Sequence, residues 1–328
     1  MITYRKATAD DVRPALDLAL RSFIQFQLPD YEPQALMHFK AVHIDNENYI
    51  QDYISNKNIM FVALDGQEIV GMINEHGTNH HISEMAVDGQ YHRRGIATAL
   101  MDRMVCKLKL NGIDRIELTS SPHGLPFYVH YGFTPTDHEK RMNGFVFTPL
   151  EYTPNEIWDI FDESGNKNGR VIERGQPMYD GEYHLAVHVW IHNRKGEWLI
   201  SKRSPEKKSS PNIWEAGGGA AVAGEDSLTA ALRETQEELR LTLDPDKGHL
   251  FTTIVHKNQH PPGGSCMADV WIFSHDCPIE DVILQPGETC DARWANADKI
   301  REMIRDKEFS SDVDLHFYEM VENWRATE

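Results

Sequence analysis

Three glutamates in the second half of the chain stand close enough in the sequence to share one metal ion. Glu234, Glu237 and Glu238 are spaced i, i+3 and i+4, so a helix would place their carboxylates on one side. Like charges this close repel one another. A hard divalent cation such as Mg²⁺ offsets that repulsion because it prefers carboxylate and carbonyl oxygens. The spacing therefore predicts a magnesium site on this helix.

The residues before these glutamates extend the pattern. Gly219 is followed after five residues by Glu225 and after seven more by Arg233. This register matches the signature of the Nudix hydrolases, G-x5-E-x7-R-E-U-x-E-E-x-G-U, in which U is an aliphatic residue. The resemblance implies that Glu225 and Arg233 fix the loop and helix, with Glu225 as a further candidate for the metal shell. It also implies these ligands for Mg²⁺ (or Mn²⁺): the Gly219 carbonyl, Glu234, Glu237 and Glu238.

Two positions depart from that signature. Thr235 stands where the family prefers an aliphatic residue, and Arg240 replaces the glycine that usually ends the helix in a left-handed turn. Neither position supplies a metal ligand, so the charged chemistry should be intact. Because an arginine at positive φ is unfavourable, Arg240 predicts a rebuilt exit from the helix.

The resemblance implies hydrolysis of a diphosphate linkage. Glu234 is the candidate general base for the attacking water, and Arg203 is a candidate contact for a substrate phosphate. The stretch 185–215 is most similar to the Nudix branch related to isopentenyl diphosphate isomerase. That isomerase uses a cysteine and a histidine where this chain has Gly218 and Ala220. Hydrolysis is therefore preferred over isomerisation.

A second group of residues, in the first half, predicts a phosphate cradle. Residues 81–87 alternate as a strand, and a loop with a glycine leads from there into a helix over 98–110. Unpaired N–H groups in the first turn of a helix bind phosphate oxygens without net positive charge. The loop resembles the acetyl-CoA pyrophosphate loop of the GNAT acyltransferases, Q/R-x-x-G-x-G/A. Here it reads His92, Arg93, Arg94, Gly95, Ile96 and Ala97.

A later segment strengthens the similarity to GNAT proteins. Residues 127–133 read F-Y-V-H-Y-G-F, which matches the F-Y-x-x-x-G-F ending typical of that family. The resemblance assigns Tyr128 as the general acid that protonates the departing CoA thiolate. A phenol suits this role because it is protonated at pH 7. Ser121 stands where many relatives have asparagine and is the candidate contact for the pantetheine arm.

The general base of the acyl transfer is less sharply defined by the sequence. Glu84 lies on the strand that flanks the acetyl group in GNAT proteins, and it could deprotonate an amine through a water molecule. His76, His80 and His81 are rival candidates because an imidazole titrates near neutral pH. The identity of the acceptor amine cannot be read from the chain.

The composition predicts two domains of ordinary size. The chain has 328 residues, of which 40% are hydrophobic. Turn-forming residues gather between 148 and 170, which places the boundary near residue 150. We expect an α/β (α+β) fold, with a GNAT-like mixed sheet and flanking helices over residues 1–150. A Nudix α/β/α sandwich is expected over residues 151–328.

The charge and hydropathy of the chain limit the classes of partner that it is expected to bind. The formal net charge of −18 argues against binding to a nucleic-acid polymer. No run of eighteen apolar residues occurs, and the first residues do not resemble a signal peptide, so we expect a cytoplasmic protein that does not contact a membrane. The four cysteines show no zinc spacing and are expected to be reduced. The sequence leaves open whether the chain forms an oligomer.

Two classes of function follow from these motifs. In the first, the chain is bifunctional: a Mg²⁺-dependent hydrolase of a nucleoside diphosphate derivative or related compound, and an N-acetyltransferase that transfers from acetyl-CoA to a small amine. In the second class, one half only binds its ligand. Either an acyl-CoA-binding domain regulates the hydrolase without turnover, or the Nudix half senses a nucleotide beside an active acetyltransferase. The intact carboxylates favour an active Nudix half.

Overall fold

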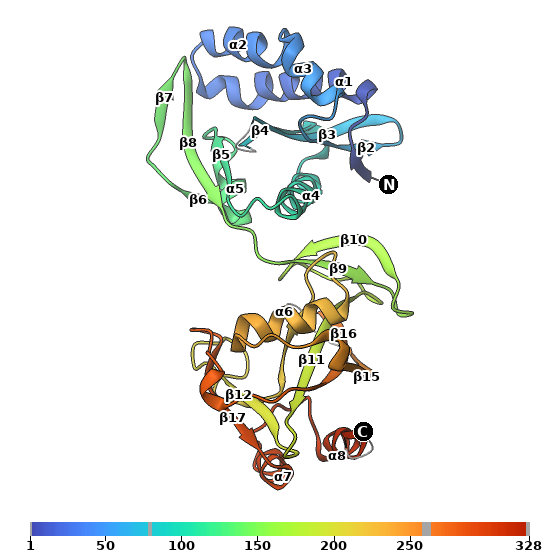
Figure 1. Ribbon diagram of the computed structural model, residues 1–328. Helices are drawn as coiled ribbons and strands as arrows, with labels where there is room; N and C mark the ends of the chain where they lie inside the picture. Colours follow the sequence, from blue (N-terminus) through green and yellow to red (C-terminus); the bar gives the residue numbers. More distant parts are fainter. Residues whose placement is uncertain (1, 78–80, 258–263, 326–328) are drawn as a thin grey trace. The chain divides into compact units, whose positions relative to one another are not determined.

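The computed structural model describes residues 2–77, 81–257 and 264–325 (Figure 1). Contacts between Cα atoms divide the chain into two compact units, Met1–Ile157 and Trp158–Glu328. Each unit buries hydrophobic clusters of its own. The division falls after the last strand of the first unit, which ends at Tyr152.

The sheet of the first unit opens between two of its strands. The strand order is β1-β2-β3-β4-β5-β8-β6, with β7 paired to β8. The neighbours β4 and β5 are parallel and share one registered pair, Ile82 with Leu118, whereas the other neighbours are antiparallel. The strands are β1 (Ile2–Lys6), β2 (Met60–Asp65), β3 (Glu68–His76), β4 (His81–Val87), β5 (Ile116–Ser120), β6 (Thr134–Pro135), β7 (Lys140–Met142) and β8 (Phe145–Tyr152).

Helices cover both faces of this sheet (Figure 1). Leu16 and Tyr49 from the helices on one face share a buried cluster with Val62 of β2. Leu100 of α4 belongs to a second buried cluster with Ile73 of β3, on the opposite face. The expected mixed sheet with flanking helices is confirmed. The helices are α1 (Ala9–Ser22), η1 (Phe23–Gln27), η2 (Leu28–Asp30), α2 (Gln34–Phe39), η3 (Lys40–Ile44), α3 (Glu47–Ile54), η4 (Gly89–Tyr91), α4 (Ile96–Leu110) and α5 (Leu125–Tyr131).

Strand β11 organises the sheet of the second unit. One edge of β11 pairs in parallel with β16 along its whole length, and the other edge pairs in turn with β9, β14 and β12, all antiparallel. The strands are β9 (Ile157–Phe161), β10 (Lys167–Glu173), β11 (Tyr183–His192), β12 (Trp198–Arg203), β13 (Trp214–Glu215), β14 (Gly217–Ala220), β15 (Gly248–His256), β16 (Ser265–Ser274) and β17 (Thr289–Ala295). This pairing places the glycine-rich strand β14 directly beside β11.

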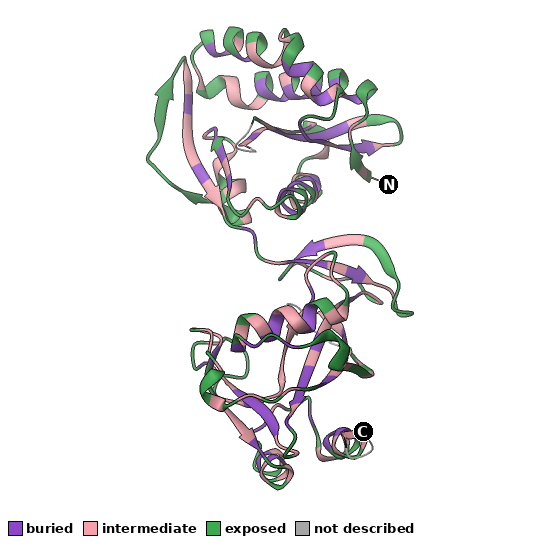
Figure 2. Ribbon diagram, viewed as in Figure 1, coloured by how far each residue is buried: buried purple, intermediate pink, exposed green. Residues whose placement is uncertain are grey.

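Alternating residues of β11 face two helical layers. Val187 and Val189 pack with helix α6 (Ser227–Leu239), whereas Trp190 packs in a separate cluster with residues of α7 (Ala297–Arg305) and α8 (Leu315–Arg325). Figure 2 shows buried positions on the sides of these helices that face the sheet. The predicted α/β/α sandwich is confirmed. Two short helices, η5 (Pro245–Lys247) and η6 (Ile279–Asp281), lie in the connections.

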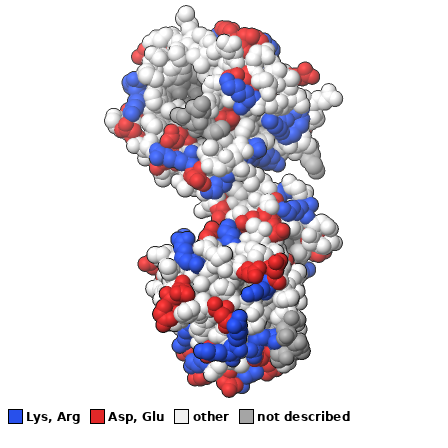
Figure 3. All heavy atoms as spheres, in the orientation of Figure 1, with Lys and Arg blue, Asp and Glu red and all other residues white. Residues whose placement is uncertain are grey.

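Charged side chains of both signs share the visible surface. On the face shown in Figure 3, Lys and Arg lie among Asp and Glu in both units. This face therefore offers no unbroken basic surface to the phosphates of a nucleic-acid polymer. Among the described residues, no helix combines the length and the apolar character needed to cross a bilayer.

The end of α6 differs from the prediction. Arg240 adopts the left-handed conformation itself, at φ 56°, and its N–H donates to the carbonyl of Gln236 at 3.2 Å. The expectation of a rebuilt exit was therefore wrong, because the arginine takes the backbone conformation that a glycine would take. A residue with a Cβ pays about 1 kcal/mol or more for this conformation.

Replacing Arg240 with glycine should stabilise the second unit by about 0.5–1 kcal/mol, because the strain at positive φ disappears while some backbone entropy is lost. Urea unfolding followed by tryptophan fluorescence reports on this unit, since all seven tryptophans lie at or after residue 158. Arg240→Ala keeps the Cβ and should give no gain. Equal stability of the glycine and alanine variants would contradict the assignment of strain.

Candidate active sites

The three predicted carboxylates lie on α6, whose first turn is capped by Asp226. The Glu234 side chain points at β14, where a Cβ built on Gly219 would lie 2.4 Å from its carboxylate carbon. Glycine at 219 is therefore required by close approach. Glu234 is 9% exposed, Glu238 is half-buried and Glu237 is exposed. The three side chains thus run from the buried to the open side of the helix.

Arg233 ties the loop before α6 to the carboxylates on it. Its Nε and Nη2 donate to both oxygens of Glu225 at 2.8 and 3.1 Å, and Nη2 also donates to the Ala220 carbonyl at 3.0 Å. Its Nη1 donates to Glu234 at 2.9 Å and to Glu237 at 3.0 Å. These contacts hold the loop against the helix, which is the role that the Nudix resemblance implied for Glu225 and Arg233.

Glu238 lies near acids from three parts of the second unit: helix α6, strand β13 and the loop before β17. Burial, followed by the nearby charges of Glu234, Glu215 and Glu288, raises the pKa of Glu238 to about 8, while Lys207 acts in the opposite direction. Lys207 forms an ion pair with Glu288. Acids gathered in this way bind a proton more tightly than usual, and a bound cation would offset the same repulsion.

The donors present fit a hard divalent cation. Glu234 and Glu238 offer carboxylate oxygens, and Gly219 offers a carbonyl beside Glu234. In the part of the chain that the structure describes, no three acidic, histidine or cysteine side chains converge as a metal site. Arg233 instead places a positive charge between Glu234 and Glu237. Binding of a metal by Glu237 therefore requires this carboxylate to leave the guanidinium.

Arg203, the predicted phosphate contact, is engaged by neighbouring groups. Its Nη1 donates to both oxygens of Glu215 at 3.0 and 3.3 Å, and its Nε and Nη2 donate to the Ser209 carbonyl at 3.3 and 3.2 Å. A substrate phosphate would have to replace some of these acceptors. Sequence reasoning missed Glu215, although its place two residues before the glycine-rich strand was a usable signal.

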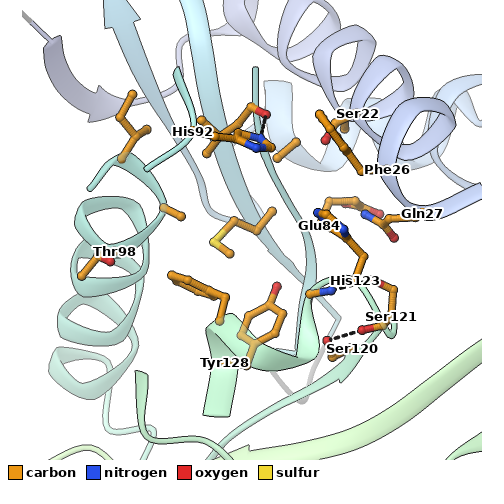
Figure 4. Close-up of a pocket in the computed structure, with 18 of the residues that line it drawn as sticks. Ser22, Phe26, Gln27, Glu84, His92, Thr98, Ser120, Ser121, His123 and Tyr128 are labelled. Carbon is orange, nitrogen blue, oxygen red and sulfur yellow. Dashed lines mark hydrogen bonds between the residues drawn. The ribbon is translucent and has the colours of Figure 1, made fainter. Parts of the chain in front are cut away.

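A cavity of about 410 Å³ fills the opening between β4 and β5 in the first unit (Figure 4). Its walls come from residues 83–87 of β4 and from residues 119–121 at the end of β5. The start of α4, α5 and the end of α1 with η1 complete them. The separation of two parallel strands beyond one registered pair thus creates the space. Glu84 is the single carboxylate among the described residues that line it.

The predicted cradle forms one end of this cavity. Gly95 is left-handed at φ 77° and immediately precedes α4, so the chain turns sharply and aims the first helical N–H groups outward. His92 contacts the Val87 carbonyl through Nε2 at 3.0 Å, and its ring lies against Phe26. Six of the lining residues belong to this end: Tyr91, His92, Arg93, Gly95, Ile96 and Ala97.

Arg94, the remaining residue of the predicted loop motif, turns away from the cavity walls. Its guanidinium lies over the Tyr91 ring, 4.9 Å from the centroid, and Arg94 is exposed. The motif therefore contributes to the cavity wall mainly through its backbone and through the side chains on either side of Arg94. This agrees with a cradle that depends on amides more than on charge.

Tyr128 lies in the cavity wall on α5, with its hydroxyl directed into the space (Figure 4). Its ring packs against Phe127 and Phe133, and none of the described side chains or backbone groups hydrogen-bonds its hydroxyl. Burial, and then the charge of Glu84, raises the pKa of Tyr128. The phenol therefore remains protonated. Ser121 also lines the cavity, and its Oγ accepts a hydrogen bond from the N–H of Gly124 at 3.1 Å.

Glu84 lies in a buried polar network. One carboxylate oxygen is 2.6 Å from Nδ1 of His43, and the other accepts the Tyr49 hydroxyl at 2.6 Å. Burial works to raise the pKa of Glu84, but His43, Tyr49 and Asn74 together lower it. The carboxylate is therefore ionised at neutral pH. His43 and Tyr49 were missed because only tertiary structure brings them to β4.

Two of the rival histidines, His76 and His81, do not line the cavity. His76 contacts the Asn58 side chain through Nδ1 at 2.6 Å, and burial lowers the pKa of His81. His80 lies outside the described residues. Glu84 is thus the predicted base that the structure places beside Tyr128 and the loop.

Comparison with known proteins finds one family in each half of the chain. Residues 27–154 match the model of the acetyltransferase (GNAT) domain, and residues 182–313 match that of the NUDIX domain. An uncharacterized Nudix hydrolase of Listeria monocytogenes is 36% identical over 155 residues, which cover 47% of this chain and 88% of the relative. An isopentenyl-diphosphate Delta-isomerase of Citrobacter koseri is 32% identical over 152 residues, 44% of this chain and 80% of that protein.

Among solved structures, the PaiA N-acetyltransferase of Thermoplasma acidophilum in complex with coenzyme A is 18% identical. The match covers 47% of this chain and 99% of that chain, with a TM-score of 0.41. The GNAT and Nudix matches fall on different parts of the chain, one within each unit.

Proposed function

Because this chain belongs to the Nudix hydrolases through its second half and carries a GNAT acetyltransferase domain in its first, we propose that it is a bifunctional enzyme with two independent active sites. One site transfers an acetyl group from acetyl-CoA to a small amine, and the other hydrolyses a diphosphate linkage. The observation that carries the proposal is that each unit assembles its own acids and phosphate-binding groups around a separate feature: the cavity between β4 and β5, and the face of α6 beside Gly219.

In the proposed acyl transfer, the pyrophosphate of acetyl-CoA binds the first turn of α4 and the thioester reaches Tyr128 and Glu84. The acceptor enters as an ammonium ion and gives one proton to Glu84. Its nitrogen attacks the acetyl carbonyl carbon, so that a C–N bond forms and the C–S bond breaks. The nitrogen loses a second proton to water, and the Tyr128 hydroxyl protonates the thiolate and recovers its proton from solvent. The net reaction releases one proton.

In the proposed hydrolysis, Mg²⁺ (or Mn²⁺) would neutralise the diphosphate and polarise the attacking water. Glu234, Glu237, Glu238 and the Gly219 carbonyl would hold the cation. Glu234 is the proposed base because it is nearly buried and fixed beside Gly219 by Arg233. Arg203 would exchange part of its bonding to Glu215 and Ser209 for a substrate phosphate.

The backbone at Gly218 supports hydrolysis over isomerisation. Gly218 has a φ of 149°, and a Cβ built there would lie 2.1 Å from the Val187 carbonyl oxygen. A cysteine, the residue that the isomerase resemblance requires, therefore does not fit this position without a backbone shift. Ala220 likewise offers no titratable group. The resemblance to the isomerases thus extends to the fold and not to their reactive pair.

Two features favour catalysis over binding alone. The Tyr128 hydroxyl lies in the cavity without a partner among the described residues, as a proton donor for substrate would. On α6, the chain keeps all three signature glutamates, and Glu238 stays near Glu234 despite their mutual repulsion, which a site that only senses a nucleotide has less need to retain. A regulatory role for either half is the competing hypothesis.

Removal of divalent metal should abolish the hydrolase and leave the acetyltransferase intact. The full chain, stripped with EDTA, would be assayed against nucleoside diphosphate derivatives, dinucleotides and CoA compounds, with and without added Mg²⁺ or Mn²⁺. We expect cleavage of one class, restored by metal, while release of CoA thiol with a panel of small amines continues in EDTA. Absence of cleavage in every class would contradict the hydrolase and favour a binding role.

A further inference from the structure

The Glu84 carboxylate contacts the imidazole of His43, a residue that does not line the cavity. The distance between Nδ1 of His43 and Oε1 of Glu84 is 2.6 Å, and the side chains are 20% and 6% exposed. The second oxygen, Oε2, accepts the Tyr49 hydroxyl at 2.6 Å. Oε1 is buried, so a proton donor in the cavity would meet the remaining lone pair of Oε2.

The helical layer over β4 determines where His43 lies. The π-helical segment η3 continues α2, and Phe39 lines the cavity one turn before His43. The His43 ring lies 4.8 Å from the Phe39 ring and 5.0 Å from the Tyr49 ring, measured between centroids. These aromatic contacts pack the imidazole beside Glu84. The arrangement resembles the histidine and carboxylate pairs that orient proton-transfer groups.

The groups around the His43 and Glu84 pair are neutral, so the Glu84 carboxylate carries the negative charge at this end of the cavity. Tyr53 donates to Tyr49 at 3.1 Å, Asn74 donates to Tyr49 at 3.2 Å, and burial raises the pKa values of Tyr49, Tyr53 and Tyr128. All three phenols are therefore neutral. Glu75 accepts the N–H of Ile59 at 2.8 Å and does not line the cavity.

The wall of the cavity opposite β4 is mainly apolar. Ala19, Ser22, Phe26 and Phe39 surround the space opposite β4. The one guanidinium among the described lining residues, that of Arg93, belongs to the loop at the other end. Two polar side chains, Gln27 and His123, also line the cavity, and the His123 ring stacks against Phe26 at 5.4 Å between centroids. A ligand that fits here carries a positive charge toward Glu84 on a small and largely apolar body.

We propose that His43 is a positioning residue for acyl transfer: it orients the Glu84 carboxylate and keeps it charged, so that Glu84 binds the acceptor as an ammonium ion and takes its proton. The acceptor class that follows is a small primary amine with a largely apolar substituent. This inference rests on the proposed acetyltransferase function. The proton passes from the amine nitrogen to a free lone pair of Glu84 and then to water.

The test compares pH profiles of kcat/KM for amine acetylation in the full chain with His43→Leu, His43→Gln and the control His38→Gln, an exposed histidine one helical segment earlier. Without its cationic or donor partner, Glu84 should hold its proton to higher pH. Activity of His43→Leu should therefore fall about tenfold or more at the acidic end and approach the wild-type rate at high pH. His43→Gln, which keeps a donor, should lie between them, and KM for acetyl-CoA should not change.

A loss of rate that is equal at every pH would indicate a purely structural role and overturn the proposal, as would an unchanged profile in His43→Leu. Preference for acceptors that lack an apolar substituent would overturn the assigned substrate class. If the wild-type chain acetylates no amine, the proposed acetyltransferase function fails, and that outcome is distinct from a normal enzyme whose profile is insensitive to His43.

Discussion

Glu238→Gln should lower kcat for metal-dependent diphosphate cleavage by about 10²–10³-fold, because it removes one negative charge from the proposed cation site. The same change should leave the metal-free protein at least as stable as the wild type. Burial and the charges of Glu234, Glu215 and Glu288 already raise the pKa of Glu238 to about 8. A neutral amide of the same shape relieves that repulsion, so function and stability should move in opposite directions.

Steady-state cleavage of the best substrate at saturating Mg²⁺ measures the first effect, and urea unfolding in EDTA measures the second. Glu302→Gln, on the outer helix α7, removes an acid outside the α6 site. It should change neither kcat nor the equilibrium constant of unfolding by more than a factor of two. Activity of Glu238→Gln within threefold of wild type would show that this carboxylate is not part of the metal site. A large loss of stability would show instead that the acid is structural.

Tyr128→Phe should reduce kcat for acetyl transfer by about 10²–10³-fold, since general acids contribute on this order. The change removes one hydroxyl and keeps the ring contacts with Phe127 and Phe133, so the cavity should retain its shape. KM for acetyl-CoA should stay within about twofold. The loss should shrink for acyl donors whose leaving thiol has a low pKa, because such a thiolate departs without protonation.

Tyr131→Phe is the matched control for this experiment. Tyr131 lies on the same helix, but its hydroxyl donates to Asp102 at 2.9 Å and it does not line the cavity. Its removal should leave the rate of acetyl transfer almost unchanged. An unaltered rate in Tyr128→Phe would exclude the general-acid role. Acetyl-CoA binding without transfer to any amine in the wild-type chain would favour a regulatory domain.

The sequence was most informative where function depends on local spacing. A helix of regular period places Glu234, Glu237 and Glu238 on neighbouring turns, with Arg233 on the same helix. Gly219 lies on strand β14, a short distance before this helix in the sequence. The same holds for Gly95, whose left-handed turn before α4 is a local property. The two fold classes were predictable for a related reason, because each motif accompanies one kind of sheet.

Long-range contacts could not be read in this way. His43 and Tyr49 meet Glu84 only because η3 and α3 pack over β4, and no periodicity links those segments. Glu215 joins Glu238 through pairing of β12 with β13, which also turns Arg203 toward Glu215. Arg240 shows the opposite case, in which a local preference was overridden by the conformation at the end of the helix.

The most direct test of two independent active sites is a crossed assay of one protein series. Wild type, Glu238→Gln, Tyr128→Phe and the double variant would each be measured for metal-dependent cleavage and for amine acetylation. We expect each single change to abolish one activity and to leave the other within twofold, so that each variant is the folding control for the other. Loss of both activities in either single variant, or of neither, would contradict the account.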